Sequence, residues 1–352
     1  MVTSATNAIT SRANIMLEHL YGNLVKESCR DYCRDSSDYI EQIISKEYQK
    51  KLTDCKSNKA GQLFILTVDV VGLYPNSPRK FVYRGLETIL KRKWNDSQVK
   101  VIMKMTKFCL EDTIIGFNNT PYVNTAGILT GANNSVSLAN AFLRMVTESL
   151  IDREGVLVFK RYIDDIICHF WGTLADLNAY IDIIIKRFLE FEMKVEFRFA
   201  SWGSGELEVE FLDINHKFYE KDQYLTSNFI KATAVNRLFL DGSSYHPMHC
   251  FKGIVAGESK RLRRLNSTNE GYLEALKNLR DKCYRSNFDK VMVNDLLEKI
   301  RSKDMGQKAA LEKIQHKSTE NKIVWSTNIP SLYQVTPKQN NLLLQNFKIQ
   351  KT

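Results

Sequence analysis

The sequence predicts an α+β protein, with strands and helices mixed in a central region from Gly61 to about Tyr219. Residues 63–68 form an apolar, β-prone run that is typical of a strand buried on both faces. Two further apolar runs, residues 156–159 and 166–168, flank a short acidic segment and predict a β-hairpin. The first 60 residues, in contrast, are predicted to be mainly helical.

Length and composition limit the class of protein. With 352 residues and 43% hydrophobic content, the chain can bury a sizeable core in two or three subdomains. The net charge of +10 suits a polyanionic partner. Seven cysteines without paired metal spacing, and no signal peptide, favour a reducing intracellular setting, the nucleus or the cytoplasm. No apolar run approaches the length of about 18 residues that a membrane span needs.

The other elements follow from local signals along the chain. Asp96 is placed to cap the helix that follows it. Residues 113–124 predict a short hairpin. From residue 220 to 301 we expect two short strands and then helices, and beyond Ser302 the chain becomes polar and poorly periodic.

Two adjacent acids, Asp164 and Asp165, lie at the tip of the central hairpin, after Tyr162 and Ile163. Like charges this close repel each other, and partial burial raises the cost unless a cation or a proton compensates. A divalent metal with oxygen ligands, such as Mg²⁺, is the simplest compensation. The alternative is that both acids are ordinary turn residues exposed to solvent.

A third acid, Asp69, ends the buried strand predicted for residues 63–68. An acid at the end of one central strand and a pair on an adjacent hairpin can meet in space. Three carboxylates could then hold two metal ions roughly 3.5–4 Å apart, as in in-line phosphoryl displacement. The alternative is that Asp69 caps the element that follows it.

Four segments, in this order, resemble the palm motifs of reverse transcriptases. They are Asp69, residues 131–135 (GANNS) with 138–140 (LAN), residues 162–165 (YIDD) and residues 211–213 (FLD). Two more segments, residues 69–78 (DVVGLYPNSP) and 244–249 (SYHPMH), resemble Penelope-like retroelements in particular. The resemblance covers roughly residues 10 to 300.

The resemblance implies a right-hand polymerase fold, whose palm is an antiparallel sheet with helices on one face. Residues 1–60 would be a residual, helical part of the fingers. Residues 61–219 would be the palm, with a fingers–palm insertion at about 76–126. Residues 220–301 would be a helical thumb, and residues 302–352 a polar tail.

The resemblance also implies a set of metal ligands and partners. Asp69, Asp164 and Asp165 would be the catalytic residues and would bind two Mg²⁺ ions, or Mn²⁺ in their place, together with the backbone of Val70. The implied partners are an RNA template, a DNA primer and deoxynucleoside triphosphates. No membrane is implied, and no protein partner is identified.

The implied nucleotide contacts are Tyr74, Thr130, Gly131 and Tyr162. An aromatic ring at Tyr74 leaves no space for a 2′-hydroxyl, which favours deoxynucleotides and disfavours an RNA-dependent RNA polymerase. Gly131 permits close approach of the backbone to a base or nucleotide. The alternative for Tyr74 is an ordinary core aromatic.

The implied primer and template contacts lie on two later segments. Residues 211–213 resemble the primer-gripping hairpin, with a plain sheet strand as the alternative. A basic cluster follows and can track a phosphate backbone, with a solvated helical face as the alternative. The contacts are Phe211, Leu212, Asp213, Lys252, Lys260, Arg261, Arg263 and Arg264.

One departure concerns the fingers, because only 68 residues precede Asp69. The Pro-Lys-x-His-Lys and Arg-Pro stretches of Penelope-like enzymes, which supply cations for the triphosphate, are not found in this sequence. From the four palm motifs we expect an RNA-directed DNA polymerase of a retroelement. The alternative is a catalytically inactive nucleic-acid-binding remnant, or a fragment, of a reverse transcriptase.

Overall fold

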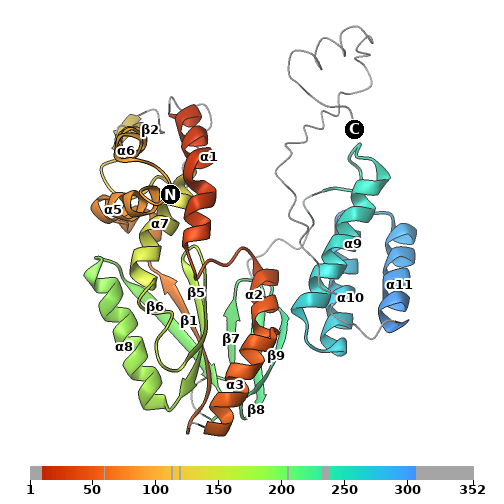
Figure 1. Cartoon of the computed structure of the whole chain (residues 1–352). Helices are drawn as coiled ribbons and strands as arrows, with labels where there is room; N and C mark the ends of the chain where they lie inside the picture. Colours follow the sequence, from red (N-terminus) through yellow and green to blue (C-terminus); the bar gives the residue numbers. More distant parts are fainter. Residues whose placement is uncertain are drawn as a thin grey trace. The chain divides into compact units, whose positions relative to one another are not determined.

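The computed structural model describes residues 10–306, except 59, 112–113, 119, 204–205, 232–237 and 239. Residues up to Ser302 cluster into one compact unit, and the contacts described below all lie within it. Figure 1 shows the order and arrangement of the elements.

The described part of the chain begins and ends with helices, and its strands lie between them in the sequence. The N-terminal half contains α1 (Ser11–Ser28), α2 (Ser36–Ile43), α3 (Lys46–Asn58), β1 (Gln62–Val70), α4 (Leu73–Asn76), α5 (Arg79–Leu90), α6 (Asp96–Glu111), β2 (Ile114–Phe117), β3 (Thr120–Val123) and α7 (Ser135–Thr147). The C-terminal half contains β4 (Val156–Tyr162), β5 (Asp165–Gly172), α8 (Leu174–Glu190), β6 (Val195–Ser201), β7 (Glu208–Phe211), β8 (Ile214–Glu220), β9 (Gln223–Asn228), α9 (Met248–Leu265), α10 (Asn269–Arg285) and α11 (Lys290–Gly306).

The central sheet has the strand order β4-β5-β1-β6, and its neighbouring strands are antiparallel. Because side chains alternate between the two faces of a strand, β1 contributes to two hydrophobic cores. Phe64, Leu66 and Val68 pack into a core with α1, α5, α6, α7 and α8. Leu63 and Ile65 pack into a second core with α2, α3, β7 and β8. This explains why the strand is apolar at nearly every position.

The second face of the sheet is covered along only part of β1. Thr67 and Asp69 continue the row of Leu63 and Ile65, but Thr67 is half-buried and Asp69 is exposed. The C-terminal end of β1 is therefore open on this face, and an acid there is accessible.

A second sheet and a helical cluster follow the central sheet. Strands β7, β8 and β9 form an antiparallel three-stranded sheet. Helices α9, α10 and α11 share a third core that includes Val255, Leu279 and Val293. The helices α9 and α10 also contact β9, and α9 contacts α2.

Several predicted elements are confirmed. The described part of the first 60 residues is mainly helical, the segment at 113–124 forms the β2–β3 hairpin, and Tyr162 to Asp165 close the hairpin of β4 and β5. The cover of the second sheet face by α2, α3 and the β7–β9 sheet was not predicted. None of the helices in the described residues is both long and apolar enough to cross a membrane.

Other boundaries differ from the prediction. Asp96 is the first helical residue of α6, and the cap is Asn95, whose Oδ1 accepts the backbone N–H of Gln98 at 3.0 Å. Asn and Asp are about equally favourable N-caps, so the sequence alone does not decide which of the two neighbours caps the helix. Between 220 and 301 the described residues contain one complete strand, β9, and α11 continues to Gly306.

Candidate active site

The register of the central sheet brings two of the predicted acids face to face. Asp69 on β1 lies directly opposite Asp165 on β5. Asp164 occupies the turn between β4 and β5, next to Ile163, which adopts a left-handed conformation with φ 56°. The carbonyl oxygen of Asp164 accepts the backbone N–H of Val70 at 3.3 Å, which ties the turn to the end of β1.

Burial and neighbouring acids raise the pKa of both Asp165 and Asp69. Burial, followed by the charges of Asp164 and Asp69, raises the pKa of Asp165 to about 6. Partial desolvation, with the charges of Asp164 and Glu196, also raises the pKa of Asp69 above its usual value. Both shifts disfavour the charged form and mark a place where added positive charge is stabilising.

Two charged residues at this site were not found by the sequence analysis. Glu196 on β6 lies opposite Asp69, on the side away from Asp165. Lys231, just after β9, lowers the pKa of both Asp69 and Asp165, although burial and the neighbouring acids outweigh it. Neither residue belongs to a motif, because strand register and chain folding alone bring them here.

A small cavity of about 250 Å³ opens beside the acids. Asp69, Asp165 and Glu196 line it, and so do Phe211 and Leu212 of the β7–β8 turn. The fold therefore brings two segments that resemble polymerase motifs to one cavity, although they are far apart in the sequence.

Carboxylate oxygens are the donors that Mg²⁺ and Mn²⁺ prefer, so the chemistry of Asp69, Asp164 and Asp165 fits these ions. As the side chains lie, no group of three or more His, Cys, Asp and Glu residues in the described part of the chain is arranged to hold a metal. Metal binding at these acids is therefore treated below as a proposal.

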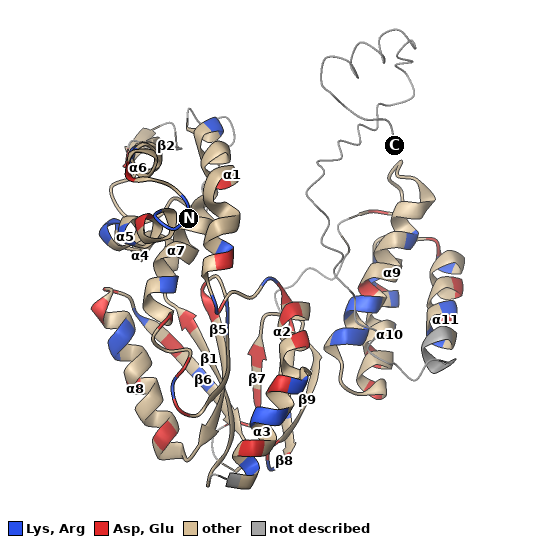
Figure 2. Cartoon of the chain, in the orientation of Figure 1, with Lys and Arg blue, Asp and Glu red and all other residues tan. Residues whose placement is uncertain are grey.

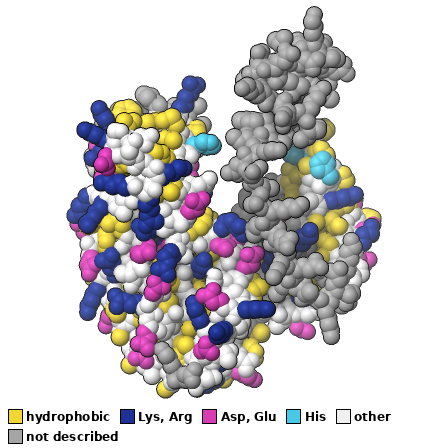
Figure 3. Space-filling model, in the orientation of Figure 1, with side chains coloured by type: hydrophobic (Ala, Val, Ile, Leu, Met, Phe, Trp, Pro, Cys, Tyr) yellow, Lys and Arg dark blue, Asp and Glu magenta, His cyan; other side chains and the backbone are white. Residues whose placement is uncertain are grey.

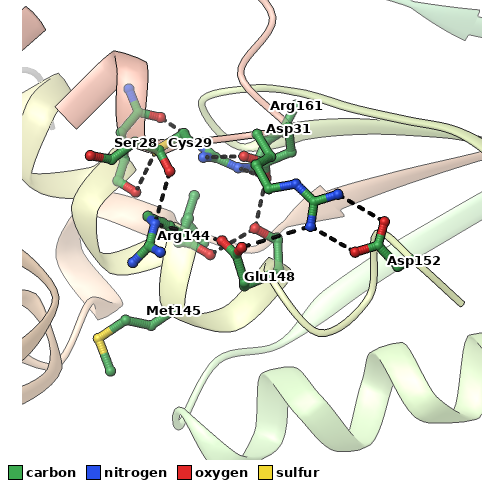
Figure 4. A network of polar contacts seen from close by, with 12 residues as sticks. Ser28, Cys29, Asp31, Arg144, Met145, Glu148, Asp152 and Arg161 are labelled. Atoms are coloured by element: carbon green, nitrogen blue, oxygen red, sulfur yellow. Dashed lines mark hydrogen bonds and ion pairs between the residues drawn. The ribbon is translucent and has the colours of Figure 1, made fainter. Parts of the chain in front are cut away.

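A buried arginine anchors the hairpin that carries the two acids. Arg161, at 0% exposure, forms an ion pair with Asp31, at 1% exposure, over 2.8 Å. Its guanidinium also donates to Oδ1 of Asn140 on α7 at 2.7 Å and to the carbonyl oxygen of Ile163 at 3.1 Å. Thr147 donates its hydroxyl to Asp31. Figure 4 shows Arg161 and Asp31 side by side within this network.

The predicted nucleotide contacts lie on two neighbouring segments. Tyr74 on α4 is half-buried, and burial with the charge of Asp164 raises its pKa to about 12. Its carbonyl oxygen accepts the N–H of Ile128 at 2.7 Å. Gly127 packs so closely that an added Cβ would lie 2.4 Å from the carbonyl oxygen of Pro75. The loop before α7 is thus fixed against the residue predicted to select the sugar.

The remaining residues of this group differ in exposure. Gly131 is exposed with φ 97°, a conformation that favours glycine, and Tyr162 is exposed at the hairpin tip. Thr130 is half-buried. Ser135 is the first residue of α7, and its hydroxyl donates to the carbonyl oxygen of Leu129.

Residues 211–213 lie at the turn of a hairpin formed by β7 and β8. The ring of Phe211 is buried at 2% exposure and packs against Tyr39 with 5.2 Å between ring centroids. Leu212 adopts a left-handed conformation at the turn, with φ 56°. Asp213 accepts hydrogen bonds from Ser36 and from Arg261 of α9. Leu212 therefore lies at the turn beside the cavity, and the buried ring of Phe211 packs behind the turn.

The predicted basic residues of α9 do not all point the same way. Arg261 pairs with Asp213 and Glu258, and Arg263 lies over the ring of Tyr272 at 5.1 Å. Lys252, Lys260 and Arg264 are exposed. Figure 2 shows blue basic positions along α9.

A groove of about 780 Å³ runs between the β7–β8 turn, the end of β9, α9 and α10. Lys231, Arg261 and Lys282 line it, and so do Gly253 and Gly257. A Cβ added at either glycine would meet no described residue within 4 Å, so this face of α9 is open toward the described part of the chain. Leu212 lines both this groove and the cavity beside the acids.

The fold is the right-hand fold known from polymerases. The RNA-dependent RNA polymerase of a human picobirnavirus is similar, with a TM-score of 0.52 and 11% identity over 86% of this chain and 57% of that chain. Likeness at this identity shows the fold.

Two further solved structures have lower scores. Telomerase from Candida albicans, in complex with a fragment of telomeric RNA, has a TM-score of 0.48 and 12% identity over 85% of this chain and 54% of that chain. The Sicinivirus RNA-dependent RNA polymerase has a TM-score of 0.43 and 12% identity over 82% of this chain and 61% of that chain. The chain thus spans a little over half the length of these proteins. No protein-family model matches the sequence, and no curated protein matches it.

Proposed function

We propose that the chain is an RNA-directed DNA polymerase domain of a retroelement, most similar to the Penelope-like group. The observation that carries the proposal is the register that sets Asp69 opposite Asp165, with Asp164 at the adjoining turn. The YIDD sequence at this turn and the DVVGLYPNSP sequence after β1 support the reverse transcriptase assignment and its Penelope-like subtype.

The proposed reaction is attack of a primer 3′-hydroxyl on the α-phosphorus of a deoxynucleoside triphosphate. A new phosphodiester bond forms, and the bond to pyrophosphate breaks. Asp69, Asp164 and Asp165 would hold two Mg²⁺ ions, which lower the pKa of the hydroxyl and stabilise the leaving group when bound. Tyr74 would limit the space beside the sugar, and Arg161 would keep the acidic hairpin in position.

The two neighbouring cavities offer a path for the primer. Leu212 lines both the cavity beside the acids and the groove lined by Lys231, Arg261 and Lys282. A primer strand lying in the groove would bring its phosphates to these cations and its 3′ end toward Asp69. The open face at Gly253 and Gly257 leaves room for a backbone to approach α9.

A primer-extension assay on an RNA template, with Mg²⁺ and deoxynucleoside triphosphates, tests the proposal. We expect extension by the wild type and a loss of at least about 100-fold in Asp164→Asn, because the variant keeps the shape of the side chain but removes its charge. Asp182→Asn is the matched control, since Asp182 is an exposed acid on α8.

Equal extension by the wild type and Asp164→Asn would eliminate the proposed site. A second candidate function is nucleic-acid binding without catalysis, which is supported by the groove lined by Lys231, Arg261 and Lys282. It predicts salt-dependent binding of RNA or DNA and no incorporation by any variant. Incorporation that depends on Asp69 would exclude it.

A further inference from the structure

Most of the surplus positive charge of the chain lies away from the acids and from α9. Between Arg79 and Glu111 the sequence has nine Lys and Arg residues and three Asp and Glu residues, a surplus of six in a chain of net charge +10. This segment is α5, α6 and the short connection between them. Figure 3 shows dark blue side chains on the surface around α5.

The lysines of α6 form one stripe. Lys100, Lys104 and Lys107 are spaced at i, i+4 and i+7, so they share a face of the helix, and all three are exposed. The stripe borders a groove of about 510 Å³ between α5 and α6. Val99 and Met103 are buried residues of α6 that also line the groove.

The stripe is only partly balanced by acids of α6, because Asp96 lies one turn before Lys100 and Glu111 one turn after Lys107. Within the described residues, neither Lys100 nor Lys104 forms an ion pair, and Lys107 lies over the ring of Tyr83 at 5.3 Å. Glu87 and Asp96 also line the groove, but Glu87 is paired with Lys91 at 2.7 Å. Like charges at i, i+4 destabilise a helix by a few tenths of a kcal/mol, so an anion bound at Lys100 and Lys104 would be stabilising.

From these contacts we propose that the α5–α6 groove binds the phosphodiester backbone of a single-stranded nucleic acid, at a site separate from the acids and from α9. The lysines of α6 contact successive phosphates, and Tyr83 with Lys107 forms the aromatic and cationic floor against which a base or sugar packs. The recognition is independent of sequence, because lysines that contact phosphates do not discriminate between bases.

The proposal does not depend on polymerase activity. A strand held here would be a distant part of a template or a separate molecule, and binding would be retained when the acids are neutralised. Wild type and Asp164→Asn should therefore bind a labelled single-stranded RNA equally at this groove, whatever the outcome of the extension assay.

Fluorescence anisotropy with a labelled oligouridylate, over a series of salt concentrations, tests the proposal. The variant is Lys100→Gln/Lys104→Gln/Lys107→Gln. The slope of log K against log salt should fall by about 2, because each phosphate contact to a single strand contributes about 0.7. The matched control is Lys46→Gln/Lys50→Gln/Lys56→Gln, which removes three exposed lysines from α3.

Three results would overturn the proposal. No change of slope in the α6 variant would show that these lysines contact no phosphate. An equal change in both triple variants would show a general effect of net charge. Polyglutamate that competes with the oligouridylate as well as unlabelled RNA does would assign the groove to acidic polypeptides instead. All six lysines are exposed, so circular dichroism should show both variants folded like the wild type.

Discussion

At the scale of single residues, Asp69 is accessible because the second face of β1 loses its cover after Ile65. Asp69, Asp164 and Asp165 were predictable from their place at the ends of apolar runs. Glu196 and Lys231 were not, because only the register of β6 and the course of the chain after β9 bring them to the acids. Such partners lie outside any local pattern.

The first prediction concerns the choice of sugar. In Tyr74→Ala the ring beside the acids is lost, so ribonucleotides should be incorporated at least about ten times better relative to deoxynucleotides, a difference of about 1.4 kcal/mol in the barrier. Tyr74→Phe is the control and should discriminate like the wild type, because it keeps the ring. Single-nucleotide incorporation with paired substrates measures the ratio. If Tyr74→Ala and Tyr74→Phe behave alike, Tyr74 is a core aromatic and does not select the sugar.

At the scale of elements, the acidic hairpin depends on a segment far away in the sequence. Asp31 lies between α1 and α2, yet its carboxylate and backbone both bind Arg161. Cys33 extends this contact, because its N–H donates to the carbonyl oxygen of Arg161. The helices and hairpins were predictable from periodicity and turn residues. A buried ion pair between a loop and a strand was not, since neither partner carries a local signal.

The second prediction is that Arg161→Met strongly destabilises the fold. The substitution leaves the carboxylate of Asp31 buried without its cation, which costs about 3–5 kcal/mol of unfolding free energy. Arg30→Met is the comparison, because Arg30 forms an exposed pair with Asp152 and should matter far less. Urea unfolding followed by circular dichroism measures both. A similar small effect of the two substitutions would refute the anchoring role.

The second core contains a buried hydrogen-bond network of His169, His216, Tyr39 and Tyr48. When both histidine rings are neutral, the position of each ring proton follows from the hydrogen-bond partners. Nδ1 of His216 donates to the carbonyl oxygen of Val209 at 3.3 Å, so Nε2 of the neutral ring accepts from the hydroxyl of Tyr39 at 2.8 Å. The Tyr39 oxygen then accepts from Nε2 of His169 at 2.6 Å, and Tyr48 donates to Nδ1 of His169 at 2.7 Å. This arrangement satisfies the nitrogens of both rings in the neutral form, which burial favours.

The third prediction is a loss of stability in acid. Burial lowers the pKa of His216 to about 4, and burial with the charge of His216 lowers that of His169 well below its usual value. As the pH falls below about 6.5, the unfolded chain takes up protons that the folded chain does not. The folded state should thus lose about 2 kcal/mol between pH 7 and pH 5 from His216 alone.

Urea unfolding at pH 7 and pH 5 measures this dependence. His169→Gln/His216→Gln should lower the stability at pH 7 and flatten its change with pH. His246→Gln/His249→Gln, which alters two exposed histidines, should leave that change as in the wild type. The same change with pH in both double variants would show that the buried pair is not its source.

At the scale of the whole molecule, the order of four motifs predicted the right-hand fold, and the likeness to the picobirnavirus polymerase supports it. The antiparallel palm sheet and the helices after β9 agree with that prediction. The cover of the second sheet face by α2, α3 and the β7–β9 sheet could not be predicted, because it depends on long-range packing between amphipathic elements. The groove between α9, α10 and the β7–β8 turn is for the same reason a property of the folded chain.

Counting metal ions in the assembled complex tests the central claim most directly. Electron paramagnetic resonance can count the Mn²⁺ bound by the protein with RNA template, primer and a non-hydrolysable deoxynucleotide analogue. We predict two tightly bound ions in the wild type, and a loss of tight binding in Asp69→Asn and Asp164→Asn but not in Asp182→Asn. Retention of both ions in Asp69→Asn and Asp164→Asn would contradict the assignment of these acids as the catalytic centre.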